Sequence, residues 1–310
     1  MRSLSWVLLT ILLAFPQLSN ADATSVPGSA NWYFYIDLAQ MRSGGPGGAI
    51  YDWLRGEVFD EVNEESGLDV EKELNSVTSY SSAEDSGVLI MEGSFSQDTR
   101  DIVMAFIASG GDLKPLKSSG KTYYHFGGDE TIDEDVSFDA GNVAFDIDSL
   151  GDEAWISMAI KNKVIVTSTE SHMKSLLKNN GKLSGQRAVK GALLVLTAEK
   201  ALLQAGVKAD AIGADDWDSN ILRNAEEIAL LVAAKADKLA IEAKLITSEP
   251  EMAQSLASVA RGLISLASFD DSMDAETASV LQGTKVQANG NSLTLSLAIN
   301  ADLVVSTLRD

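Results

Sequence analysis

The sequence predicts an α+β protein of two halves, each an antiparallel sheet with amphipathic helices packed on one face. Short apolar segments with two-residue alternation recur along the chain, and Gly- or Asn-containing turns separate them. Amphipathic stretches that begin at Ser or Thr follow several of these segments. A polar, Gly-containing connector, residues 179–191, divides the pattern. We therefore expect an N-terminal domain at residues 22–186 and a smaller C-terminal domain at 187–310.

The first 21 residues have the features of a secretory signal peptide. Arg2 supplies a positive start, and "LSWVLLTILLAF" is an apolar run too short for a stable membrane anchor. Ser19 and Ala21 suit the small-residue positions before a cleavage site. We expect a periplasmic or secreted protein after cleavage near Ala21, with no transmembrane segment in the mature chain. The sequence contains no cysteine, so an exported chain of this kind depends on its core alone.

Strands and helices alternate in the first half. "WYFYIDL" predicts a buried strand, and after a glycine-rich loop "GGAIYDWLRGEVFDEV" predicts an amphipathic helix with Ile50, Trp53, Leu54 and Val58 at helical spacing. Positive φ at the glycines of that loop would permit a tight turn. Further strands are expected at "SVTSYSSA", "SGVLIMEGSF" and "KTYYHF", together with a helix, "DTRDIVMAFIASGG", that Ser96 caps.

The clearest local pattern is "VSFDAGNVAFDID", which predicts a hairpin that turns at Gly141–Asn142. Its register places Phe138 opposite Phe145 and Val136 opposite Ile147, on one face. "AWISMAIKNKVIVTS" predicts a second hairpin, turning at Asn162–Lys163, and the helix "ESHMKSLLKNN" follows it.

The second half begins with the strand "ALLVLTA". Residues 228–246 suit a long helix by composition, but Leu239, Ile241 and the following apolar positions alternate with polar or small ones. We interpret this segment as two strands that turn at Asp237–Lys238. A last hairpin is expected at Asn289–Gly290, with Leu293, Leu295, Leu297 and Ile299 on one face.

Two segments of the chain follow the same plan, which predicts an internal repeat. Each has a strand that ends in Thr-Ser and then a helix: Thr167, Ser168, Ser175 and Leu176 match Thr247, Ser248, Ser255 and Leu256. Ser248 and Glu251 have the spacing of a capping box, and Pro250 suits a first helical turn. "YIDLAQM" before a helix, and "LAIEAKLITSEPEMAQSLASVARGL", resemble uncharacterised exported bacterial proteins with duplicated α+β halves. That group implies no activity and no functional residue.

The acidic balance of the chain argues against nucleic acid as a partner. The formal net charge is −21, and residues 122–160 hold ten acids and no Lys or Arg. The predicted hairpin gathers acidic residues on one face: Asp133, Asp135, Asp139, Asp146 and Asp148. A bound divalent cation would relieve their repulsion, and so would water and salt. Asp216, Asp218, Asn220 and Glu227 follow calcium-loop spacing, but Ile221 occupies the position that requires Gly.

Motifs for catalysis or phosphate binding are incomplete. The loop from Gly44 to Gly48 lacks the last glycine of a dinucleotide fingerprint, and "KSSGKT" has Pro115 where a P-loop requires Gly. "SHMK" from Ser171 fits the S-x-x-K pattern without its partner motifs, and His125 lies in a predicted strand. We therefore assign no catalytic, cofactor-binding or metal-binding residue and expect no cofactor.

These observations favour an exported, acidic, non-enzymatic binding or structural protein of the bacterial cell envelope. Its partner would be a protein or a small-molecule ligand. Two alternatives stay open: a carboxylate-dependent exported hydrolase, because paired acids can perform acid–base chemistry, and a calcium-stabilised extracellular module.

Overall fold

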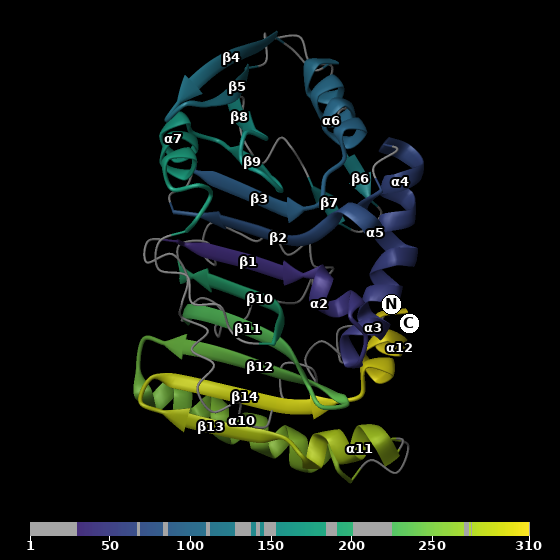
Figure 1. The fold of residues 1–310 in the computed structure, drawn as a ribbon. Coiled ribbons are helices and arrows are strands. Elements are labelled where there is room, and N and C mark those ends of the chain that lie inside the picture. The colour runs from purple at the N-terminus through teal and green to yellow at the C-terminus, as the bar shows by residue number, and fades with distance from the viewer. Residues whose placement is uncertain are drawn as a thin grey trace. The chain divides into compact units, whose positions relative to one another are not determined.

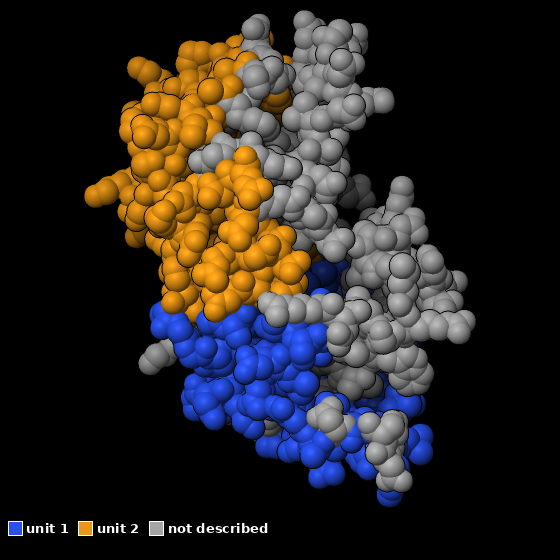
Figure 2. Space-filling model, turned by 90° about the vertical axis from the view of Figure 1, so that its right-hand side faces the viewer, with its two compact units in different colours: residues 1–26, 43–50, 187–310 blue, residues 27–42, 51–186 orange. Residues whose placement is uncertain are grey.

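The chain folds as an α+β protein with antiparallel strands in two compact units. The computed structural model describes residues 30–66, 69–82, 86–109, 112–127, 138–140, 143–145, 153–183, 191–200, 225–269, 273 and 275–309. Unit 1 comprises residues 1–26, 43–50 and 187–310, and unit 2 comprises residues 27–42 and 51–186 (Figure 2). The predicted signal peptide lies outside the described residues.

Within their sheet, the strands of unit 2 follow the order β1-β2-β3-β9-β8-β5-β4, and every neighbouring pair is antiparallel (Figure 1). Its core includes Tyr33, Ile90, Tyr123 and Ile165, each less than a twentieth exposed. The strands are β1 (Trp32–Asp37), β2 (Leu74–Ser81), β3 (Gly87–Gly93), β4 (Asp112–Ser118), β5 (Lys121–Gly127), β8 (Glu153–Ser157) and β9 (Lys163–Thr167), and a separate pair is formed by β6 (Phe138–Ala140) and β7 (Val143–Phe145).

Helices pack on this sheet at several places. α2 contacts β2, α6 contacts β4, and α7 contacts β4, β8 and β9. Ser96 caps α6 as predicted, because its Oγ accepts a hydrogen bond from the Thr99 amide at 3.1 Å. These helices are α2 (Leu38–Arg42), α5 (Val70–Glu73), α6 (Gln97–Ser109) and α7 (Glu170–Lys178).

The predicted helix at residues 47–62 is present, but a π-helical turn interrupts it. α3 (Pro46–Leu54) continues through η1 (Arg55–Phe59) into α4 (Asp60–Ser66). Tyr51 and Phe59 are the buried aromatic side chains, with ring centroids 5.7 Å apart, whereas Trp53 and Val58 are only partly buried. The expected apolar stripe is therefore only partly buried, and the π turn, which begins at Arg55, adds a residue and shifts Val58 relative to Trp53 and Leu54.

The hairpin register around residues 138–145 is confirmed, because Phe138 pairs with Phe145. The turn residues and the predicted pair of Val136 and Ile147 lie outside the described residues. The β8–β9 hairpin is also present. Its turn lies at Lys161–Asn162, one residue before the predicted position, and Asn162 takes the positive φ of 62° that this turn requires.

The sheet strands of unit 1 follow the order β13-β14-β12-β11-β10, again with antiparallel neighbours. α10 packs on β12, β13 and β14, and α11 contacts β14 (Figure 1). Its strands are β10 (Ala192–Glu199), β11 (Ala225–Lys235), β12 (Lys238–Thr247), β13 (Lys285–Asn289) and β14 (Ser292–Ile299), and its helices are α10 (Pro250–Ala267), α11 (Ala275–Gln282) and α12 (Ala301–Arg309).

The ambiguous segment at residues 228–246 forms two strands, as predicted. The turn is at Ala236–Asp237, one residue earlier than expected, and Ala236 has a φ of 56°. The expected face of β14 is confirmed as well, since Leu293, Leu295, Leu297 and Ile299 are all at most 6% exposed. The β13–β14 turn lies at Gly290–Asn291, one residue later than predicted.

The predicted capping box at the start of α10 was wrong. Glu249 is the N-cap, without a side-chain capping bond, and Ser248 is exposed. Pro250 does occupy the first turn, as expected. The buried Thr247 hydroxyl donates instead to the Glu249 carbonyl at 2.7 Å, and this bond gives both buried polar groups of the turn a partner.

Candidate binding pocket in unit 2

A small apolar pocket lies in unit 2 between α5, α6 and the sheet. Its volume is about 70 Å³. This is roughly half the volume of a 150 Å³ apolar cavity that accepts benzene. The lining residues are Asp69, Val70, Glu73, Leu74, Met91, Phe95, Thr99, Arg100, Val103, Met158 and Val164.

Each wall of the pocket follows from local structure. Val70 and Leu74 come from α5 and the start of β2, and Met91 and Val164 come from the neighbouring strands β3 and β9. Val103 projects from α6 at helical spacing from Thr99 and Arg100. The methionines supply flexible, polarizable surface that adapts to an apolar guest.

The polar side chains at the pocket are already bonded within the protein. A Glu73 carboxylate oxygen accepts the Ser96 amide at 3.1 Å, and Arg100 donates to the Met158 carbonyl at 3.0 Å. Asp69 accepts from the Lys72 ammonium at 2.6 Å. Each of these side chains thus has a partner within the protein, and the pocket surface itself is apolar, so recognition in the pocket is mainly apolar.

Both carboxyls at the pocket are held in their ionised form. The hydrogen bond from Lys72 lowers the pKa of Asp69. Burial alone would raise the pKa of Glu73, but hydrogen bonds from Thr99 and Ser96 outweigh it and lower that pKa. A general acid in a hydrolase needs a raised carboxyl pKa, so this pair does not suit that role.

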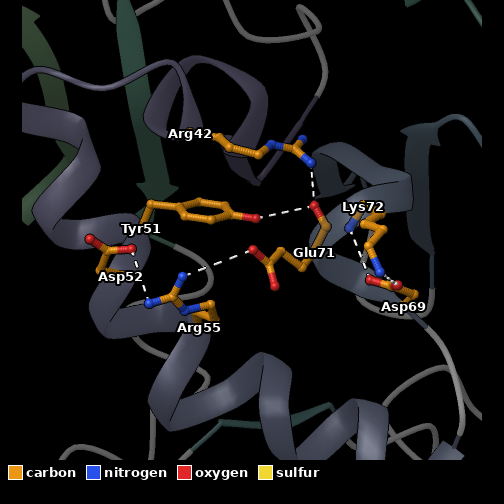
Figure 3. A network of polar contacts seen from close by, with 7 residues as sticks. All are labelled: Arg42, Tyr51, Asp52, Arg55, Asp69, Glu71 and Lys72. Atoms are coloured by element: carbon orange, nitrogen blue, oxygen red, sulfur yellow. Dashed lines mark hydrogen bonds and ion pairs between the residues drawn. The ribbon is translucent and has the colours of Figure 1, made fainter.

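The pocket wall formed by α5 is fastened by Arg42 of α2. Its guanidinium donates to the carbonyls of Glu71 and Leu74 and to the Asn75 side chain, the last two at 3.0 and 3.1 Å. The Tyr51 hydroxyl also donates to the Glu71 carbonyl, at 3.2 Å, and Figure 3 shows both groups converging on that oxygen. A helix as short as α5 is unstable alone, so these bonds maintain the wall.

A second set of charges surrounds this connection. Arg55 lies 3.4 Å from Asp52 and 4.0 Å from the Glu71 carboxylate (Figure 3). The Arg42 guanidinium also lies 5.6 Å from the centroid of the Tyr51 ring, a cation–π distance. Burial raises the pKa of Tyr51, so its hydroxyl stays protonated as a donor.

Gly93 allows α5 to approach β3 closely. A Cβ at this position would lie 2.0 Å from the Glu73 carbonyl oxygen, which is backbone and cannot move aside easily. The Ser94 amide donates to the same oxygen at 2.7 Å. The pocket therefore depends on a glycine that the sequence pattern did not single out.

The glycine motifs identified in the sequence serve as turns. Gly44 and Gly45 have φ values of 98° and 65° and connect α2 to α3, which confirms a turn at this loop. In "KSSGKT", Ser119 and Gly120 form the β4–β5 hairpin turn with φ values of 52° and 74°. Their conformations match a two-residue hairpin turn rather than a phosphate-binding loop.

The histidines have structural neighbours. His172 lies in the first turn of α7, as predicted for "SHMK", and its ring contacts Thr169 at 2.8 Å and Ser82 at 3.4 Å. His125 lies in β5 against Trp155, with ring centroids 4.9 Å apart, and its Nε2 is 3.8 Å from a Glu153 oxygen.

Of the acidic candidates, the described residues include Asp139, in β6, and Glu227, in β11. Asp133, Asp135, Asp146 and Asp148 lie outside the described residues, as do Asp216, Asp218 and Asn220. Within the described ranges, no three His, Asp or Glu side chains are placed to hold a metal ion. Also within those ranges, no helix combines the length and hydropathy needed to cross a bilayer.

Sequence reasoning did not find the pocket, because its residues come from distant parts of the chain. Arg42 and Leu74 are 32 positions apart, and Arg100 and Met158 are 58 apart. No short motif records such proximity. The cap at Ser96 was predicted from the sequence, but its convergence with α5 was not.

The chain shows structural similarity to TP0453 of Treponema pallidum. Crystal form III matches with a TM-score of 0.46 and 13% identity, over 94% of this chain and 98% of that chain. Form IV matches with a TM-score of 0.46 and 14% identity, over 92% and 96%. Form I matches with a TM-score of 0.43 and 14% identity, over 94% and 98%. No family model matches the chain, and no curated protein matches it.

Proposed function

We propose that this protein is an exported, acidic, non-enzymatic binding protein of the bacterial cell envelope, and that the pocket in unit 2 receives an aliphatic group of its partner. The observation that carries the proposal is an apolar pocket of about 70 Å³ whose polar neighbours already form hydrogen bonds within the protein. Such a site can anchor a side chain or alkyl group by burial.

The size of the pocket selects the guest. It is smaller than a cavity that accommodates benzene, so a branched aliphatic group such as that of leucine or valine fits better than an aromatic ring. The net charge of −21 favours a partner with basic residues around that group, because opposite charges accelerate association. Apolar anchoring would then supply affinity, and the acidic surface would supply the rate of encounter.

Other parts of the proposal rest on the sequence. They are the signal peptide that ends near Ala21, the division at residues 186 and 187 into two α+β halves with helices on one face of each sheet, and the resemblance to exported proteins with such halves. Of the alternatives, the hydrolase is disfavoured by the ionised pair Asp69 and Glu73. The calcium-stabilised module has no supporting observation among the described residues.

Methyl NMR tests the pocket directly. With ¹³C-methyl methionine labelling, we expect N-acetyl-leucinamide at millimolar concentration to shift the Met91 and Met158 signals, and N-acetyl-glycinamide to leave them unchanged. Val103→Trp should fill the pocket and abolish the shift. Ile102→Trp is the matched control, because Ile102 is exposed on the same helix. Unchanged Met91 and Met158 signals in the wild-type protein would reject the pocket as the binding site.

A further inference from the structure

Large apolar side chains cover the side of α10 that faces away from the sheet. The fully buried residues of the helix are small, Ala253, Ala257 and Ala260, each at most 3% exposed, and Leu256 and Ile264 beside them are half-buried. On the opposite side Val259 is 59% exposed and Leu266 is 70% exposed, and Phe269, just after the helix, is 79% exposed. The outer face of α10, as used below, consists of Ser255, Ser258, Val259, Gly262, Leu266 and Phe269.

The middle of this face is electrically neutral in a strongly acidic protein, and exposed Glu251 lies one turn before Ser255, at the start of the face. Between Met252 and Phe269 the only charged residue is Arg261, against a net charge of −21 for the chain. The Arg261 guanidinium donates to the Val286 carbonyl of β13 at 2.9 Å, so it is turned toward the sheet. A neutral face does not attract a basic partner, whereas two copies of the protein can meet there without the repulsion that operates between acidic surfaces.

The hydroxyls on the outer face already have partners. Ser255 donates to the Glu251 carbonyl at 2.8 Å, and Ser258 donates to the Gln254 carbonyl at 2.9 Å. Their hydroxyl protons can therefore be buried against another protein surface without losing a partner. A Cβ added at Gly262 would meet no neighbouring atom within 4 Å, so open space lies in front of this residue.

We propose that the outer face of α10 binds the same face of a second copy of this chain, across a twofold axis near Gly262. A twofold contact between two identical helix faces brings residue pairs together reciprocally, and an antiparallel arrangement of the helices also aligns their dipoles favourably. Small residues at Ser255, Ser258 and Gly262 permit helix axes to approach to about 8 Å. This inference does not depend on the pocket in unit 2.

The contact should be weak. A helix of 18 residues is about 27 Å long, and one helix per copy supplies less than the roughly 800 Å² per partner of a standard interface. We therefore expect a dissociation constant in the micromolar range. Salt should strengthen the dimer, because it screens the repulsion between acidic surfaces and does not weaken apolar contact.

The absence of cysteine gives a direct test. In Gly262→Cys, mild oxidation should form a disulfide-linked dimer, because the two thiols lie near the twofold axis. Ser306→Cys, on the exposed side of α12, is the control and should give little cross-linked product. Equal cross-linking of the two variants would contradict the proposal.

Sedimentation of the unmodified chain tests the affinity. Gly262→Glu should weaken dimerisation at least tenfold, while Ser306→Glu adds the same charge elsewhere and should leave it unchanged. The Gly262 site has room for a side chain, so the thermal melting temperature at low concentration should not fall, which separates lost association from lost folding. A wild-type protein that stays monomeric up to about a hundred times the expected micromolar range overturns the inference. So does a monomer whose Gly262→Cys variant, carrying a fluorescent label on the new thiol, binds phosphatidylcholine vesicles through this face.

Discussion

The β9–α7 turn in unit 2 and the β12–α10 turn in unit 1 have the same internal hydrogen bond. Thr167 and Thr247 end their strands, and both are fully buried. Each hydroxyl donates to the carbonyl two residues further along, that of Thr169 at 2.9 Å and that of Glu249 at 2.7 Å. The matching Thr-Ser sequences at the two turns therefore correspond to the same hydrogen bond. The internal repeat stays a prediction.

The two helices that follow differ in which side carries the large side chains. α7 buries Met173, Leu176 and Leu177, and its exposed side carries Lys174, which is paired with Glu170 at 2.6 Å. α10 buries alanines and exposes Val259 and Leu266. The comparison teaches that the turn sets the path of the chain, whereas the packing distance and the exposed chemistry depend on each helix separately.

The largest expected effect is at the inner face of α7. Leu177→Ala removes a fully buried side chain and leaves a cavity, so we expect a loss of about 2–5 kcal/mol in the free energy of unfolding. Urea denaturation measures it. Lys174→Ala on the exposed side should change stability by no more than about 0.5 kcal/mol. Similar losses in both variants would mean that α7 does not bury the face assigned to it.

In α10 the informative substitution replaces a small residue by a large one, because the fully buried residues of this helix are alanines. Ala257→Leu overpacks the buried face of the helix and should cost about 1–3 kcal/mol. Val259→Leu, on the outer face of the same helix, should be nearly neutral at low protein concentration. Urea denaturation of the two variants checks this, and a neutral Ala257→Leu would show that α10 lies further from the sheet than described.

The shared hydrogen bond is tested by Thr167→Val and Thr247→Val, which keep the side-chain shape but remove the donor. Each leaves a carbonyl without its partner, so we expect a loss of about 1–2 kcal/mol. Thr247→Val should lose at least as much, because its hydroxyl also lies 3.0 Å from the Asn291 carbonyl. A stability change at only one of the turns would show that the two bonds are not equivalent.

The two turns differ in their helix caps, so substitutions at the caps should have unequal effects on stability. Thr169 accepts the His172 amide as the N-cap of α7, so Thr169→Ala should cost about 1 kcal/mol. Glu249 is the N-cap of α10 without a side-chain bond, so Glu249→Ala should change stability little. Denaturation at constant pH compares them, and a larger loss from Glu249→Ala would contradict the capping geometry.

Tyrosine ionisation at alkaline pH should affect only the unit that contains α7, because all six tyrosines precede residue 187. Burial, and then the 2.6 Å hydrogen bond to Glu170, raise the pKa of Tyr123 to about 12. The pKa of Tyr123 in the folded protein exceeds the unfolded value near 10. The contribution of its protonated hydroxyl to the free energy of unfolding is therefore complete below pH 10 and is lost as pH rises toward 12.

At pH 10.5 the free energy of unfolding lost through Tyr123 should be below about 1 kcal/mol. Tyr123→Phe should therefore show a smaller fall in unfolding free energy between pH 8 and pH 10.5 than the wild-type protein. Tyr80, whose pKa burial also raises to about 12, continues to contribute in the variant. An unchanged pH dependence in Tyr123→Phe would show that this hydroxyl ionises as freely as in the unfolded chain.

Local sequence patterns were sufficient where a structure closes over a few residues. The pairing of Phe138 with Phe145, the cap at Ser96 and the two strands at residues 228–246 were predicted from such patterns. The turns near Asn162 and Ala236 shifted by one residue, because several neighbouring positions can adopt positive φ and only the pairing of the strands selects one.

The candidate pocket could not be predicted in this way. Arg42 reaches the carbonyls of Glu71 and Leu74 only because β1 pairs with β2, which brings α2 beside α5. The exposed apolar side of α10 was equally hidden. An amphipathic pattern shows that large residues share a side, but it does not show whether that side or the alanine side meets the sheet.

The sequence by itself determined the class of fold, the alternation of strands and helices, and an acidic chain that lacks cysteine, because periodicity, turn residues and charge are properties of short segments. The tertiary structure decided the strand order, the pocket beside α5 and the outward direction of Val259 and Leu266. These depend on which distant segments pack together, and that choice is set by the sum of many burial terms rather than by any single motif.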